Sequence, residues 1–107
     1  MKVFIFREKS GIKAEAEYNF ETKECKVLKG STVSGTVTYS EKFRGAASIE
    51  KAREGKLKGN TVIKDVVFKS ASTAANFVTG NSTNGLTTWK NKDGKSIKDI
   101  IKEGANE

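Results

Sequence analysis

The chain has 107 residues, which is enough for one domain with a modest core, and we expect a single domain over residues 1–107. No stretch approaches the roughly 20 apolar residues that cross a bilayer, and one Cys excludes an internal disulfide, so we expect a cytoplasmic protein. The 20 basic and 13 acidic residues give a net charge of +7, which fits either a polyanionic partner or a solvated surface.

The first third of the sequence predicts an antiparallel meander of three strands. Residues 3–7 are apolar on both faces, which predicts a central strand. Residues 13–20 alternate between apolar and polar side chains, the pattern of a half-buried strand. After a short turn, residues 25–29 return as a third strand, with Cys25 and Val27 on one face.

The middle of the chain predicts one helix and further extended segments. Residues 36–39 are extended, and Ser40 has the side chain of an N-cap for a helix over about 41–54. Gly55 ends this helix. Residues 61–68 are rich in β-branched side chains and predict a strand or an extended chain.

The clearest helix of the chain is predicted to begin near residue 70. Ser70 or Ser72 caps it, and Gly80 is the expected left-handed stop. Its apolar stripe has the spacing i, i+3, i+4, i+7 and consists of Ala71, Ala74, Ala75 and Val78. Because three of these four residues are Ala, another element must approach the helix closely.

A turn, a strand and a final helix follow. Asn84 and Gly85 predict a tight turn with Gly85 at positive φ, and residues 86–89 predict a short strand or an extended return. Ser96 and Asp99 predict the start of the last helix. The buried stripe of that helix is predicted to consist of Ile97, Ile100 and Ile101. Residues 104–107 are predicted to form a flexible tail.

These elements together predict an α+β fold. An antiparallel sheet, formed by the three-stranded meander and further short strands, packs with two or three short helices. We find no internal repeat, linker or low-complexity segment in the sequence.

Two separated motifs carry a resemblance to a known family. Residues 68–89 include the pattern Ser70, Ser72, Ala74, Ala75, then Asn84, Gly85, Leu86 and Trp89. A second element, Val-Leu-Lys-Gly-Ser, occupies residues 27–31. The pattern resembles the restriction-enzyme-and-adenine-methylase-associated (RAMA) domain and a related family of unknown function, although Leu86 stands where the RAMA pattern has its first Trp. The resemblance implies association with restriction-modification or DNA-processing enzymes.

The sequence is poor in catalytic groups. It has no His, the commonest acid/base group and metal ligand at neutral pH. Cys25 is interpreted as a small core residue, because its activating partner could only be Lys, Arg or a helix N-terminus. One Cys without His does not make a zinc site. We therefore expect no enzymatic activity, no metal and no cofactor, with an enzyme that uses Cys25 as an alternative.

The candidate binding residues are mostly basic. Residues 42–64 hold most of the charge excess, and the main candidates for phosphate contact are Arg44, Lys51, Arg53, Lys56 and Lys58. Secondary candidates are Lys90, Lys92 and Lys95. Ser70 and Ser72 are candidates for a phosphate contact, with helix capping as the alternative. Trp89 is a candidate for base stacking, with packing in the core as the alternative.

We therefore expect a non-catalytic module that interacts with nucleic acid, DNA rather than RNA, and that is linked to restriction-modification or DNA-processing systems. The alternative is a protein-interaction or assembly module that binds an acidic partner through the same basic surface. Neither function involves a membrane, and the sequence leaves the oligomeric state open.

Overall fold

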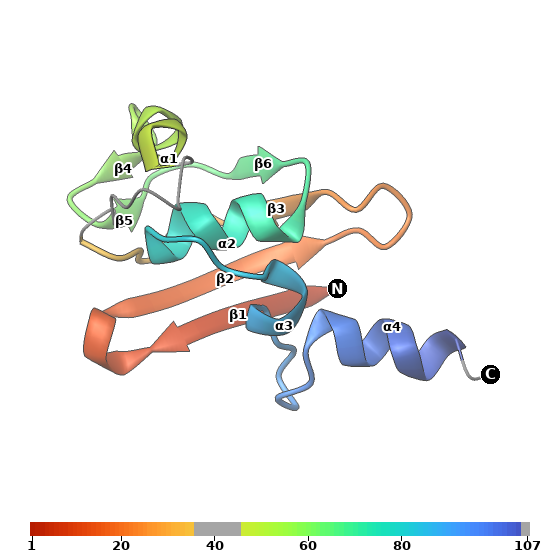
Figure 1. The fold of residues 1–107 in the computed structure, drawn as a ribbon. Coiled ribbons are helices and arrows are strands. Elements are labelled where there is room, and N and C mark those ends of the chain that lie inside the picture. The colour runs from red at the N-terminus through yellow and green to blue at the C-terminus, as the bar shows by residue number, and fades with distance from the viewer. Residues whose placement is uncertain (36–45, 106–107) are drawn as a thin grey trace.

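The computed structural model of the chain describes residues 1–35 and 46–105. Within these residues the fold is α+β, as expected: a four-stranded antiparallel sheet, a two-stranded sheet and four short α-helices (Figure 1). The predicted cap Ser40, the predicted extended segment 36–39 and the first part of the predicted helix 41–54 lie outside the described residues.

The four-stranded sheet contains the predicted meander. Its strands are β1 (Lys2–Arg7), β2 (Ile12–Tyr18), β3 (Cys25–Val27) and β6 (Val66–Phe68), in the order β1-β2-β3-β6. The short 3-10 helix η1 (Glu8–Ser10) joins the first two strands. Every neighbouring pair in the sheet is antiparallel, so the meander is confirmed and β6 extends it.

The predicted central position of the first strand is wrong, because β1 is an edge strand. Its outer edge is only partly satisfied: Phe4 N donates to Lys90 O at 2.7 Å, and Lys90 N donates to Phe4 O at 3.1 Å. The strand looks central in the sequence because its outward positions also hold large apolar side chains, Phe4 and Phe6. Phe6 is 68% exposed, so apolar side chains on both faces did not require burial on both faces.

The strand predicted over 61–68 is divided into two. β5 (Thr61–Val62) pairs with β4 (Leu57–Lys58) to form the two-stranded sheet, and β6 joins the larger sheet. Asp65 lies at the break, and its Oδ1 accepts a hydrogen bond from Lys29 N at 2.8 Å. This contact holds the break beside the segment that follows β3, and β-branched composition alone does not indicate it.

The helices lie mainly on one side of the sheet. They are α1 (Ala46–Arg53), α2 (Ala71–Thr79), α3 (Gly85–Thr88) and α4 (Ile97–Ala105). Figure 1 shows α2 lying across the sheet, where it contacts β2, β3 and β6. Because α4 continues to Ala105, the tail predicted over 104–107 is helical in its first half, while 106–107 lie outside the described residues.

The short strand or extended return predicted over 86–89 is wrong for its first three residues, because residues 85–88 form α3, and only Trp89 is extended. Asn84 caps this helix by accepting a hydrogen bond from Leu86 N at 3.0 Å. Gly85 does not have the predicted positive φ. It is required for another reason: a Cβ at this position would lie 2.1 Å from the carbonyl carbon of Ala71. The missing side chain lets α3 approach the first turn of α2.

One hydrophobic cluster fills the space between the sheet and the helices. The inward side chains of β1 and β2 pack against α2, which confirms the predicted stripe of Ala71, Ala74, Ala75 and Val78. The stripe predicted for α4 is only partly buried, since Ile97 is fully buried, Ile100 is half-buried and Ile101 is 45% exposed. The reason is that α4 packs mainly on α3 and projects beyond the sheet (Figure 1).

Candidate nucleic-acid interface

Four lysines lie on the two-stranded sheet or on the segments next to it in the chain. Lys51 is exposed on α1, Lys58 is exposed on β4, Lys64 is exposed after β5, and Lys56 is half-buried before β4. Ile63 N donates to Lys56 O at 2.9 Å, which holds the segment after β5 beside Lys56. We call these four residues the lysine cluster. Within the described residues, none of them forms an ion pair with a carboxylate. Arg44, the other basic candidate upstream, lies outside the described part of the chain.

Arg53 is a predicted phosphate contact, but the structure shows that its guanidinium already has partners within the protein. Its Nε and Nη2 donate to Phe77 O at 3.0 and 2.6 Å, and its Nη1 donates to Ser34 O at 3.0 Å. The guanidinium carbon also lies 5.8 Å from the centre of the Phe77 ring. Burial lowers the pKa of Arg53, and the charge of Glu50 opposes this shift. Arg53 therefore ties α1 to the C-terminal end of α2.

The two serines at the start of α2 both have internal partners. Ser70 Oγ accepts a hydrogen bond from Thr73 N at 3.1 Å, so the capping alternative is confirmed for Ser70. Ser72 Oγ accepts from Gly85 N at 3.0 Å and so joins α2 to α3. Neither hydroxyl needs a phosphate to satisfy it.

Trp89 lies in the core, so the structure contradicts base stacking and confirms the alternative. The side chain is fully buried, and its Nε1 donates to Ala71 O at 3.0 Å. The Trp89 indole and the Gly85 backbone thus both contact the same turn of α2. The sequence motif within residues 68–89 therefore lies where α2 and α3 pack together.

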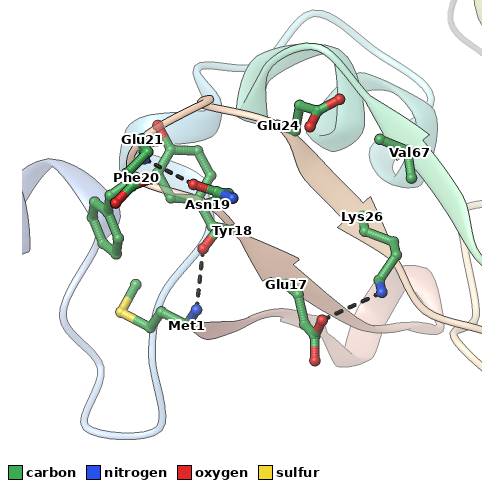
Figure 2. Close-up of a pocket in the computed structure, with 9 residues that line it drawn as sticks. All are labelled: Met1, Glu17, Tyr18, Asn19, Phe20, Glu21, Glu24, Lys26 and Val67. Atoms are coloured by element: carbon green, nitrogen blue, oxygen red, sulfur yellow. Dashed lines mark hydrogen bonds and ion pairs between the residues drawn. The ribbon is translucent and has the colours of Figure 1, made fainter.

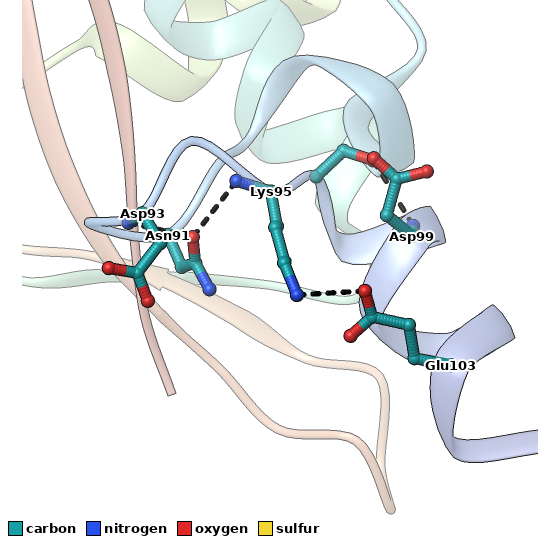
Figure 3. A network of polar contacts seen from close by, with 6 residues as sticks. Asn91, Asp93, Lys95, Asp99 and Glu103 are labelled. Carbon is teal, nitrogen blue, oxygen red and sulfur yellow. Dashed lines mark hydrogen bonds and ion pairs between the residues drawn. The ribbon is translucent and has the colours of Figure 1, made fainter.

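The secondary lysines do not act as one group. Lys95 Nζ lies 2.8 Å from Glu103 Oε1, and its backbone N donates to Asn91 Oδ1 at 3.0 Å (Figure 3). The hydrogen bond and charge of Glu103 raise the pKa of Lys95. Lys92 is exposed in the same turn. This turn lies on the other side of the molecule from α1 (Figure 1), so it does not extend the lysine cluster.

Lys90 lies on a surface that the sequence did not indicate. The register of β1 with β2 places Phe4 opposite Glu15 and Phe6 opposite Lys13, and a bridge places Lys90 opposite Phe4. Directly opposed residues of antiparallel strands share a face. The outward face of the sheet, here called the open face, therefore carries Lys2, Phe4, Phe6, Lys13, Glu15, Glu17, Lys26, Val67 and Lys90. All nine side chains are exposed or half-buried.

The open face differs in charge between its two ends. Lys2 and Lys26 are neutralised by Glu15 and Glu17, at 3.1 and 3.4 Å. A hollow of about 640 Å³ lies beside the ion pair of Lys26 and Glu17, at the β2–β3 turn. Figure 2 shows Glu17, Glu21 and Glu24 among the residues that line it. This end is unsuited to a polyanion. Lys13 and Lys90 lack ion pairs within the described residues, so the positive charge remains at the other end.

The described residues offer little to catalysis or metal binding. Cys25 is fully buried, and burial raises the pKa of its thiol to about 12, which confirms its interpretation as a core residue. No group of three or more His, Cys, Asp or Glu side chains in residues 1–35 and 46–105 could hold a metal ion. Over the same ranges, no helix has the length and apolar character needed to span a membrane.

Comparison with known proteins gives a family without an assigned activity. No curated protein and no solved structure matches the chain significantly. A family model does match, over residues 4–101, which runs from within β1 to within α4 and includes both sequence motifs. The chain therefore belongs to the family described as a domain of unknown function (DUF4357).

Proposed function

We propose that this domain is a non-catalytic module that binds nucleic acid, DNA rather than RNA, by contacts between lysines and backbone phosphates. The observation that carries the proposal is the lysine cluster. Lys51, Lys56, Lys58 and Lys64 follow one another closely in the chain and form no ion pair among the described residues, and they outnumber the exposed Glu50, Glu54 and Asp65 of the same stretch. Unpaired lysines that share one part of the surface give a local field that attracts a polyanion.

The mechanism is displacement of condensed counterions. Each lysine that neutralises a phosphate releases cations from the DNA. A plot of the logarithm of the binding constant against the logarithm of the salt concentration therefore has a slope of about −0.9 per contact. Such contacts carry no base sequence information. We therefore propose a module that holds DNA without reading its sequence through the cluster.

The cellular context follows from resemblance. The motifs at residues 27–31 and 68–89 resemble those of RAMA domains and their relatives, which occur with restriction-modification and DNA-processing enzymes. We extend that association to this chain, as a domain that acts beside such an enzyme. The buried, protonated thiol of Cys25 and the lack of His support a role in binding.

The test is a fluorescence-anisotropy titration with a labelled duplex of about 20 base pairs at several salt concentrations. The wild type is expected to bind at low salt with a clear salt slope. The double variant Lys51→Gln/Lys58→Gln is expected to weaken binding and to reduce the slope by about 1.8, that is, by about 0.9 for each lost contact.

A control variant separates local contacts from total charge. Lys23→Asn/Lys102→Gln removes the same charge from exposed positions in the β2–β3 turn and on α4, and Asn tolerates the positive φ of residue 23. It is expected to bind as the wild type does. If both variants lose affinity equally, the cluster is not the contact surface. If neither duplex nor single strand binds at about micromolar concentration, the proposal is wrong and an acidic protein partner becomes the better explanation.

A further inference from the structure

The open face combines exposed aromatic rings with positive charge. Phe6 is 68% exposed, and the half-buried Phe4 lies two residues away on the same face of β1. One exposed apolar residue needs no explanation, because such residues are common on protein surfaces. Two aromatic residues in successive outward positions of an edge strand form a surface on which planar groups can stack.

Each of these rings has a lysine directly opposite it. Lys13 is paired with Phe6 across the β1–β2 ladder, and Lys90 is paired with Phe4 on the free edge of β1. Neither lysine has an ion pair among the described residues. The nearest acidic residue of this face, Glu15, is held by Lys2 at 3.1 Å. Each of two neighbouring outward positions thus has an aromatic ring beside a lysine. This arrangement suits a single nucleic-acid strand, in which bases and phosphates alternate.

The surface is hollowed on both sides of Phe4. A hollow of about 360 Å³ is lined by Phe4, Phe6, Arg7 and Lys90 among others. A second hollow of about 280 Å³ is lined by Phe4, Lys13 and Lys29 among others, and by Glu15, which Lys2 neutralises. Both hollows therefore combine an aromatic wall with basic side chains, and Arg7 and Lys29 add to the positive charge around them.

The same face leads without interruption to the lysine cluster. Opposed pairs run from Phe6 to Lys13, from Lys13 to Thr32, from Thr32 to Thr61, and from Thr61 to Lys58. Four strand spacings of about 4.8 Å give a track of roughly 19 Å. Aromatic rings stand at one end of this track and a residue of the proposed phosphate-binding cluster at the other.

We propose that the open face binds the unpaired bases of single-stranded nucleic acid, which stack on Phe6 and Phe4 while Lys13 and Lys90 contact the phosphates. The inference rests on the nucleic-acid function proposed above and names its ligand more closely. A duplex does not satisfy this surface, because its base faces are already stacked and its major groove admits a helix or a two-stranded ribbon, not a four-stranded face.

The experiment compares three labelled ligands by anisotropy: an oligothymidylate of about 15 nucleotides, an abasic strand of the same length and a duplex. The abasic strand keeps the phosphates and lacks the bases. Phe6→Leu removes the ring at an exposed position and keeps apolar bulk, so circular dichroism is expected to be unchanged. Its matched control is Phe20→Leu, because Phe20 is 41% exposed on the acidic hollow of Figure 2.

The expected result is that the wild type binds the oligothymidylate more tightly than the abasic strand. Phe6→Leu should weaken oligothymidylate binding about fivefold or more and leave binding of the abasic strand and the duplex unaffected. The control Phe20→Leu should bind the oligothymidylate as the wild type does. An oligouridylate arm distinguishes DNA from RNA, since stacking serves both.

The outcomes separate the two proposals. If the domain binds duplex but no single strand, or if Phe6→Leu binds the oligothymidylate as the wild type does, this inference is overturned and the phosphate-binding function stands. Equal affinity for abasic and base-containing strands overturns it in the same way. If none of the three ligands binds, the proposed function fails, and the inference fails with it.

Discussion

Gly85 shows how a single residue sets the distance between two helices. Its α-carbon rests against the backbone of Ala71 and Ser72, and Ser72 Oγ accepts a hydrogen bond from its N–H at 3.0 Å. The sequence indicated that a glycine was needed here. It suggested the wrong reason, since the constraint is the space available between segments that are more than ten residues apart.

Replacing Gly85 by Ala is expected to destabilise the fold by at least about 2 kcal/mol, because the new Cβ would overlap backbone atoms that cannot move aside. Urea denaturation measures the effect. Gly35→Ala is the matched control: its φ is not positive, and the nearest atom to a new Cβ is the side-chain nitrogen of Asn60 at 3.2 Å. That variant should stay within about 1 kcal/mol of the wild type. Equal losses in the two variants would contradict the steric explanation.

Arg53→Met is expected to lower the free energy of unfolding by about 2 kcal/mol or more, because the carbonyls of Ser34 and Phe77 lose a charged donor. The matched variant is Lys51→Met, two residues earlier on α1 and exposed, which should change stability by less than about 0.5 kcal/mol. Chemical denaturation of both variants gives the comparison. A stable Arg53→Met protein would show that the guanidinium contacts contribute little.

The buried thiol of Cys25 makes stability depend on alkaline pH. Burial raises the thiol pKa in the folded state from 9.0 to about 12, so the unfolded chain releases its proton first as the pH rises. The stability that the protonated thiol contributes to the folded state is fully present below about pH 9. It is lost between about pH 9 and 12, by at most about 1.4 kcal/mol per pH unit.

Cys25→Ala is expected to be less stable than the wild type at pH 7, because it leaves a cavity, and the difference should shrink between pH 9 and 11. Denaturation curves at each pH measure this. Tyr18, whose pKa is raised first by burial and then by the charge of Cys25, titrates in both proteins, so the effect of its burial cancels and only its interaction with Cys25 differs. A constant difference over this range would show that the thiol ionises as readily in the folded state as in the unfolded chain.

At the scale of elements, the helix α2 was predictable and its neighbour α3 was not. The alanine stripe, the Ser70 cap and the Gly80 stop are local signals, and each one is present in the structure, Gly80 with φ 76°. The helix α3 has one turn, so its four residues are too few to show a helical period. Its conformation depends on Asn84 as a cap and on contact with α2, and the second of these is tertiary information.

The serines of α2 provide a test of this arrangement. Ser70→Ala is expected to cost about 1 kcal/mol and to increase hydrogen exchange at the Thr73 amide, which loses its cap. Ser72→Ala is expected to cost about 1–3 kcal/mol and to increase exchange at the buried Gly85 amide instead. Amide exchange followed by NMR resolves the two sites. Protection of Gly85 that persists in Ser72→Ala would mean that this bond does not join the helices.

The strand β1 shows why the open face was not visible in the sequence. Phe4 and Phe6 raise the apolar content of its outward side, which favoured burial on both faces. The alternation of Lys13, Glu15 and Glu17 on the next strand does indicate a solvated face. Once the register places these residues opposite β1, the two phenylalanines are seen to lie on that face with them. Only the pairing of the strands connects the two patterns.

For the whole molecule, the predicted basic residues divide according to tertiary contacts. Arg53 and Lys95 are engaged by groups that are eight or more positions away in the chain, which charge counting cannot reveal. Lys51, Lys56 and Lys58, near the two-stranded sheet, form no ion pair within residues 1–35 and 46–105, and Lys90 joins the open face. The sequence therefore predicted the fold class and the basic character, while the division into a lysine cluster and an aromatic face required the strand register.

Continuity between these two surfaces predicts a preference for DNA junctions. If a duplex occupies the lysine cluster and an unpaired strand lies along the track toward Phe6, one DNA molecule with both parts gains from a high effective concentration of its second part. A duplex with a single-stranded overhang of about ten nucleotides is expected to bind about tenfold or more tightly than the better of its two components measured alone.

Variants identify the two contributions to this preference. Phe6→Leu should reduce overhang binding toward that of the blunt duplex, and Lys51→Gln/Lys58→Gln should reduce it toward that of the free strand. Overhangs at the 5′ and at the 3′ end are compared, because the direction from Lys58 to Phe6 is fixed and one polarity fits it better. If overhang DNA of either polarity binds no more tightly than its better component, the two surfaces do not serve one ligand, since a continuous track of roughly 19 Å would let both parts bind together.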